Sequence, residues 1–238
     1  MKIKSVDYSI VDHCNLNCAG CSHFSPIAEL RFASLERFEK NIIKLSSYNL
    51  NIEQFNLLGG EPLLHSQIKD FILVSKKYLK TNIVVKTNGI LLNDDFIRFC
   101  DKHNVTLVVA NYGLNIKHTN NPLIDDFMYN YIGTIPIEFN SCVLYNTSYN
   151  NSCSQLEDNG DLHFCTYSAN IKHYNKFYNT NIPTIKDRDY VNIYDNDFMK
   201  KYFMGSLCRR PFCNYCRPPK IKPWHLFNKI NEWVDISN

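Results

Sequence analysis

Residues 11–26 read VDHCNLNCAGCSHFSP and place Cys14, Cys18 and Cys21 within eight positions. The loop directly follows residues 3–11, whose alternating apolar pattern predicts a β-strand. A structural zinc site takes four protein ligands, whereas this loop supplies three thiols. Ligands of parallel α/β sheets bind at the carboxyl ends of the strands. The stretch therefore predicts a metal centre at such an end with one coordination position left open.

Strand patterns alternate with helix patterns through the first half of the chain. Strands are expected at residues 3–11, 54–58, 82–87, 105–110 and 135–139, and amphipathic helices at 34–45, 66–78 and 93–100. This alternation is typical of βαβ units and a parallel sheet. A complete eightfold barrel takes about 250 residues, and the whole chain has 238. We therefore expect an α/β fold with a partial, open parallel β/α barrel.

The composition of the sequence changes after about residue 145. This change divides the chain into two expected domains, 1–145 and 146–238. The second part is polar and rich in turns, and Asn159–Gly160 predicts a tight turn between two short hairpin arms. Residues 166–195 show no clear periodicity and are expected to be irregular. We therefore predict a small, irregular, cysteine-rich domain after the barrel.

Composition narrows the functional classes. The chain has 10 cysteines and a net charge of only +3, so nucleic acid is not an expected partner. No segment approaches the roughly 20 apolar residues of a membrane span, and the start shows no secretory leader. We expect a cytoplasmic protein without a membrane partner. Clustered thiols in that compartment indicate metal binding or chemistry rather than disulfides, whereas the isolated Cys100 and Cys142 are expected to lie in the core.

Two further motifs accompany the cysteine loop. LLGGEPLLH, residues 57–65, follows the second expected strand, and KTNG, residues 86–89, ends the third. With the CxxxCxxC spacing, these motifs resemble the radical S-adenosylmethionine (SAM) superfamily over roughly the first 115 residues. The resemblance implies a 4Fe-4S cluster on Cys14, Cys18 and Cys21, whose open iron binds SAM. It also implies reductive cleavage of SAM to a 5′-deoxyadenosyl radical that abstracts hydrogen from a substrate.

The resemblance also implies which residues bind SAM. They are expected to be Gly59, Gly60, Glu61, Pro62, Asn88 and, at the end of the fourth strand, Asn111. Glycines allow close approach of the backbone to a ligand. One position departs from the family, because Gly20 stands where an aromatic residue usually precedes the third cysteine. His23 or Phe24 is expected to take that place, or His23 to act on the cluster through a hydrogen bond.

The C-terminal cysteines resemble the auxiliary-cluster regions called Twitch and SPASM. CSQLEDNGDLHFC spans residues 153–165, and CRRPFCNYC spans 208–216. The resemblance implies a second 4Fe-4S cluster on Cys153, Cys165, Cys213 and Cys216, with Cys208 as an alternative ligand. A four-cysteine zinc site is the other interpretation, because Cys213 and Cys216 also have zinc-knuckle spacing.

These resemblances favour an oxidoreductase that acts on a small polar substrate, a carbohydrate or nucleotide sugar in polysaccharide or natural-product biosynthesis. Oxidation or epimerisation is the expected outcome, with Cys142 as a candidate hydrogen donor and flavodoxin or ferredoxin as the external reductant. The basic tail, which includes Arg210 and Arg217, predicts either an anion site for the substrate or a solvated surface. The alternatives are a peptide-modifying radical SAM enzyme and a non-catalytic iron–sulfur electron carrier.

Overall fold

The computed structural model describes residues 2–114, 123–124, 126–129, 132–137, 154–206, 210–217 and 220–226. The expected domain boundary at residues 145 and 146 lies outside these ranges, as do Cys142, Cys153 and Cys208. Among the described residues, every helix is too short or too polar to cross a bilayer.

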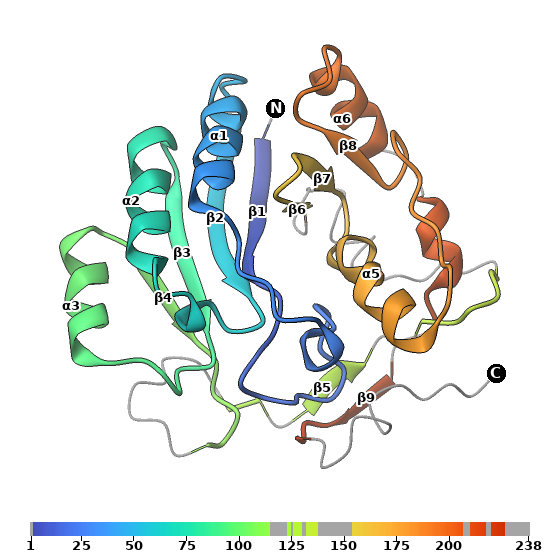
Figure 1. The fold of residues 1–238 in the computed structure, drawn as a ribbon, viewed down its shortest axis with the longest axis horizontal. Helices are drawn as coiled ribbons and strands as arrows, with labels where there is room; N and C mark the ends of the chain where they lie inside the picture. The colour runs from blue at the N-terminus through green and yellow to red at the C-terminus, as the bar shows by residue number, and fades with distance from the viewer. Residues whose placement is uncertain are drawn as a thin grey trace.

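A seven-stranded, mostly parallel open sheet forms the frame (Figure 1). Its order is β4-β3-β2-β1-β6-β7-β8, and β1 to β4 and β6 run parallel, whereas β7 and β8 are antiparallel to their neighbours. The strands are β1 Lys2–Val11, β2 Asn51–Gly59, β3 Asn82–Thr87, β4 Thr106–Val109, β6 Ser154–Leu156, β7 Asp161–His163 and β8 Tyr190–Asn192. The expected open parallel β/α sheet is confirmed, and it does not close into a barrel.

Three amphipathic helices connect the first four strands, as expected. They are α1 Leu35–Ser46, α2 Ile68–Tyr78 and α3 Asp94–Lys102. Ser34 caps α1 by accepting from the Arg37 amide, and Asn93 caps α3 by accepting from the Phe96 amide. Their apolar faces pack on one face of the sheet together with α6, Phe198–Ser206.

Residues 154–163 form the expected hairpin, with β6 paired to β7 across the Asn159–Gly160 turn. Residues 166–178, in contrast, were expected to be irregular and form the helix α5, Thr166–Tyr178. Sequence periodicity does not reveal this helix because it is buried on most sides and includes polar residues. Asn170, for example, bonds to Gln155 and to the Thr166 carbonyl.

A second core lies beneath α5. The 3-10 helices η1, Ser25–Ile27, and η3, Pro211–Tyr215, meet α5 there. The remaining short elements are η2, Pro62–Leu64, and a separate antiparallel pair, β5, Asp126–Tyr129, with β9, Lys220–Pro223. The strand expected at 135–139 is wrong over its described part, 135–137. Pro136 has no N–H for a ladder hydrogen bond there.

Candidate active site

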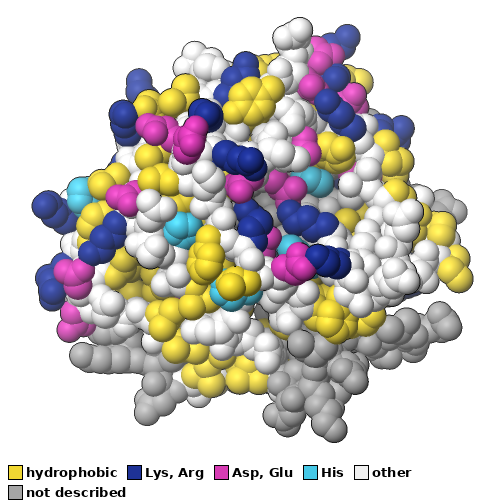
Figure 2. All heavy atoms as spheres, viewed as in Figure 1, with side chains coloured by type: hydrophobic (Ala, Val, Ile, Leu, Met, Phe, Trp, Pro, Cys, Tyr) yellow, Lys and Arg dark blue, Asp and Glu magenta, His cyan; other side chains and the backbone are white. Residues whose placement is uncertain are grey.

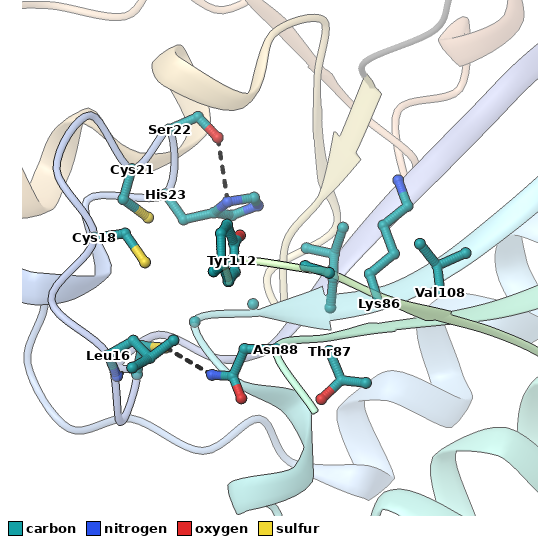
Figure 3. Close-up of a pocket in the computed structure, with 15 residues that line it drawn as sticks. Leu16, Cys18, Cys21, Ser22, His23, Lys86, Thr87, Asn88, Val108 and Tyr112 are labelled. Atoms are coloured by element: carbon teal, nitrogen blue, oxygen red, sulfur yellow. Dashed lines mark hydrogen bonds between the residues drawn. The ribbon is translucent and has the colours of Figure 1, made fainter. Parts of the chain in front are cut away.

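The cysteine loop and the ends of β2, β3 and β4 enclose one cavity of about 290 Å³. Its walls include all three cysteines of the loop, Cys14, Cys18 and Cys21, together with Gly59 and Gly60 (Figure 3). The structure therefore brings the predicted cluster ligands and the glycine motif together at the carboxyl end of the parallel strands.

Burial controls the protonation of these thiols. It raises the pKa of Cys14 and of Cys18 to about 12, and the neighbouring cysteines add to the shift. The Cys14 sulfur accepts hydrogen bonds from the Leu16 amide, at 3.4 Å, and from Asn88 Nδ2, at 3.6 Å. Because metal ligation requires thiolates, cluster binding here would displace protons from the loop.

The two glycines fit backbone against backbone. A Cβ atom at Gly59 would lie 2.1 Å from the Val11 carbonyl oxygen, and one at Gly60 would lie 1.9 Å from that of His13. The Gly60 amide donates to Val11 O at 2.7 Å, and the Glu61 amide donates to His13 O at 3.2 Å. Because the two glycines lack side chains, the end of β2 packs directly against the backbone of the cysteine loop. Both glycines also line the cavity.

Glu61 is a buried junction between two motifs. Its carboxylate accepts from the Leu63 amide at 2.9 Å, from Thr87 Oγ1 at 2.7 Å and from the Asn88 amide at 2.8 Å. Burial raises its pKa, although these hydrogen bonds oppose the shift. Pro62 is also buried and begins η2. In this structure Glu61 joins the GGEP loop to the TNG strand end.

Asn88 and Asn111 occupy different positions. Asn88 lines the cavity, and its Nδ2 donates to Asn15 Oδ1 at 2.7 Å as well as to the Cys14 sulfur. Side chains alternate at the end of β4, so that Ala110 and Tyr112 line the cavity. Asn111 lies on the other face, where its Oδ1 accepts from the Gly113 amide at 3.2 Å.

His23 and Phe24 also lie in different parts of the structure. His23 lines the cavity, and its Nδ1 lies 3.4 Å from Ser22 Oγ (Figure 3). Phe24 packs instead in the second core, edge-on to Tyr167. Tyr112, which the end of the fourth strand already suggested beside Asn111, lines the cavity and stacks on Trp224 with ring centroids 4.7 Å apart. No sequence signal links these two rings, because they are separated by more than 100 positions.

Three of the predicted auxiliary ligands are described. Cys216 is part of the second core and Cys165 packs against it, while burial raises the pKa of Cys165 to about 12, with Cys213 among the neighbours that add to the shift. Among the described residues, no group of three His, Cys, Asp or Glu side chains could hold a single metal ion, and this holds for Cys14, Cys18 and Cys21 as well as for the auxiliary cysteines. Cys100 is buried in the main core, as expected.

Comparison with known proteins agrees with this geometry. The radical SAM superfamily profile matches residues 8–132. GTP 3′,8-cyclases of Petrotoga mobilis and Clostridium botulinum are 34% and 31% identical over 95 and 96 residues. These matches cover 37% and 39% of this chain but only 29% and 30% of the two relatives. The chain therefore belongs to the radical SAM superfamily, whose members use a 4Fe-4S cluster and SAM.

A solved structure shares the fold over nearly the whole chain. The complex of BtrN with AdoMet and 2-DOIA superposes with a TM-score of 0.54 at 14% sequence identity, and the match covers 92% of this chain and 95% of BtrN. At that identity the likeness concerns the fold. It extends the similarity beyond the matched profile and into the C-terminal third.

Proposed function

We propose that this chain is a radical SAM oxidoreductase that acts on a small hydroxylated substrate, a carbohydrate or a related compound. When bound, a 4Fe-4S cluster on Cys14, Cys18 and Cys21 supplies the electron that cleaves SAM to a 5′-deoxyadenosyl radical, which abstracts hydrogen from the substrate. An external flavodoxin or ferredoxin provides the electron. Gly59, Gly60 and Asn88 line the part of the cavity where SAM would bind.

The observation that carries the proposal is the shared cavity. Three thiols from a single loop meet the ends of three parallel strands, and the loop is fixed by backbone contacts to the glycine motif. Three thiolates leave one iron of a cubane cluster without a protein ligand. Such an iron binds an outside molecule, so the site is built for reaction rather than for structural support.

We also propose that residues 146–238, part of which completes the main sheet, hold an auxiliary cluster with Cys153, Cys165, Cys213 and Cys216 as ligands and Cys208 as the alternative. The packing of Cys165 against the second core, which includes Cys216, supports this arrangement. A second cluster held there would accept the one electron that an α-hydroxy radical of the substrate loses on becoming a ketone, and the hydroxyl proton would pass to solvent. Anaerobically reconstituted protein is expected to bind about eight irons, whereas about four irons with one zinc would favour the zinc site.

Formation of 5′-deoxyadenosine tests the function directly. Reduced, reconstituted enzyme is expected to release it from SAM, and Cys18→Ser is expected to abolish the release. The matched change Cys100→Ser, in the core and away from the cavity, should keep the activity in whatever fraction of the protein folds. A wild-type sample with a complete cluster content that releases none would instead identify an electron carrier.

A further inference from the structure

The sheet face opposite the main core is polar. In β1, Val6, Tyr8 and Ile10 pack among the helices. Because side chains alternate along a strand, Asp7 and Ser9 face the other way, yet both are buried. Buried polar side chains require partners, so this inner face is either an internal network or the wall of a site for a polar ligand.

Asp7 is the centre of a small cluster that spans three strands. Asn56 on β2 donates from Nδ2 to Asp7 Oδ1 at 2.5 Å, and Lys86 Nζ on β3 lies 3.9 Å from the same oxygen. Lys86 forms part of the cavity wall, and Figure 3 shows its side chain beside Val108, on the side away from Cys18 and Cys21. Leu58, one pleat beyond Asn56 on β2, lines the cavity too. Lys86 therefore connects the cluster to the cavity of the cysteine loop, whereas Asp7 and Asn56 lie behind its wall.

Two buried polar atoms in this region have no partner within the described parts of the chain. They are Asn56 Oδ1 and His23 Nε2. A buried acceptor left without a hydrogen bond costs about 1–3 kcal/mol. The native protein tolerates this cost where a ligand completes the bonding. An oxygen acceptor, a carboxylate and an ammonium group in one cluster can both accept from and donate to a ligand, which is the pattern that hydroxyl groups require.

The charge of the described part of the cavity wall does not favour a diphosphate. Lys86 is the one Lys or Arg among the described residues that line it, and Asp7 balances its charge. Arg210 and Arg217 are the two arginines of the basic tail within the described residues, and neither is among the residues that line the cavity. Arg210 is buried, with its guanidinium 5.3 Å from the centre of the Phe164 ring, and Arg217 donates to the backbone carbonyls of Ile135 and Tyr215. Neither is placed to neutralise the phosphates of a nucleotide sugar.

We infer that Asp7, Asn56 and Lys86 form a substrate-recognition site for the neighbouring hydroxyl groups of a phosphate-free polyol, a cyclitol or free sugar. This inference rests on the proposed function, because the site is useful only beside a radical-generating centre. Substrate hydroxyls donate to Asp7 and to Asn56 Oδ1 and accept from Lys86. The site thus selects the free polyol over its nucleotide-activated form.

Deuterium transfer tests the inference separately from SAM cleavage. Carbon-deuterated myo-inositol, scyllo-inositol, glucosamine and UDP-glucose would each be incubated with reduced holoenzyme and SAM. The measured quantity is the deuterium incorporated per 5′-deoxyadenosine formed. We expect incorporation from at least one polyol and none from UDP-glucose. Lys86→Met and Asp7→Asn should reduce it roughly tenfold or more, as the loss of a hydrogen bond to a charged group predicts.

Lys40→Met is the matched control, because Lys40 pairs with Glu36 on the solvent side of α1 and should leave the incorporation unchanged. Transfer from UDP-glucose alone, no transfer from any polyol while SAM is cleaved, or polyol transfer that neither variant lowers would each overturn the inference and leave the proposed function intact. Failure of the wild-type enzyme to cleave SAM would instead reject the proposed function, and with it the recognition site.

Discussion

Arg31 holds Asp12 with both branches of its guanidinium group. Nε donates to Oδ2 at 2.6 Å and Nη2 donates to Oδ1 at 2.7 Å, while Nη1 reaches Asp158 Oδ2 at 2.8 Å. Asp12 stands two residues before Cys14, so this pair anchors the entrance of the cysteine loop to the hairpin β6–β7. Figure 2 shows basic, acidic and histidine side chains gathered near the centre of the face between α1 and α5.

Arg31→Ala is expected to destabilise the protein and loosen the cluster loop. Burial opposes ionisation of Asp12, but Arg31 holds the pKa of that carboxyl below its usual value. Removing Arg31 leaves a buried carboxylate without its main partner, at a cost of about 3 kcal/mol. The value is at the low end of the range because Arg31 is 34% exposed. Anaerobic urea unfolding and iron content measure the two effects.

Lys40→Ala provides the matched control for that experiment. Its ion pair with Glu36 is fully exposed to solvent, and such pairs contribute little to stability. Equal losses of stability in the two variants would contradict an anchoring role for Arg31.

Gly60→Ala is expected to prevent cluster assembly. Its methyl group would lie 1.9 Å from the His13 carbonyl oxygen, which belongs to the backbone of the cysteine loop and has no free direction in which to move. Reconstituted Gly60→Ala should retain only a small fraction of the iron of the first cluster. Gly133→Ala is the matched control, because its methyl group would meet only the end of the Arg217 side chain, at 1.8 Å. That side chain can move away, so this variant should keep its iron. Full iron retention by Gly60→Ala would refute the tight fit.

Glu61→Ala should cost about 3 kcal/mol or more, because three donors lose their acceptor in a buried position. Glu53→Ala is the matched change at an exposed ion pair with Lys2 and should cost less than about 1 kcal/mol. Comparison of the two unfolding curves separates a structural junction from a residue that only touches SAM. A Glu61→Ala protein of wild-type stability with weakened SAM binding would favour the second role.

Acid should destabilise the fold through His163. Burial lowers the pKa of His163 to about 4 from an ordinary 6.5. Between these values the unfolded chain binds a proton that the folded protein excludes, so stability is complete above pH 6.5 and falls as the pH approaches 4. The expected contribution is about 2–3 kcal/mol. His163→Gln should reduce the loss of unfolding free energy between pH 7 and pH 5, and an unchanged slope would argue against this assignment.

The parallel sheet and its cysteine loop follow from local patterns. Val6, Tyr8 and Ile10 alternate as a strand requires, and Ser34 and Asn93 mark helix starts by capping chemistry. The α5 helix escaped detection, because the buried Asn170 and His173 interrupt any apolar stripe. Helix periodicity reports burial on one face, and α5 is buried on several.

The sequence predicted residues of the site only where they belong to one contiguous motif. The glycines of the GGEP motif were expected to let the backbone approach a ligand. In the structure, the backbone of the cysteine loop also leaves no room for a side chain at either position. The Asp7–Asn56–Lys86 cluster joins three strands and has no local signature. One signal was available in β1, where polar residues alternate with apolar ones in a strand that lies at the centre of the sheet. Such a pattern indicates an inner wall rather than a solvent face.

Electron paramagnetic resonance of the anaerobically reduced enzyme, with and without SAM, tests the central claim most directly. A cluster on Cys14, Cys18 and Cys21 with one open iron should give the signal of a reduced 4Fe-4S centre whose shape changes when SAM is added. In Cys14→Ala this signal and its response should be lost. A fully assembled cluster whose spectrum is identical with and without saturating SAM would contradict the account.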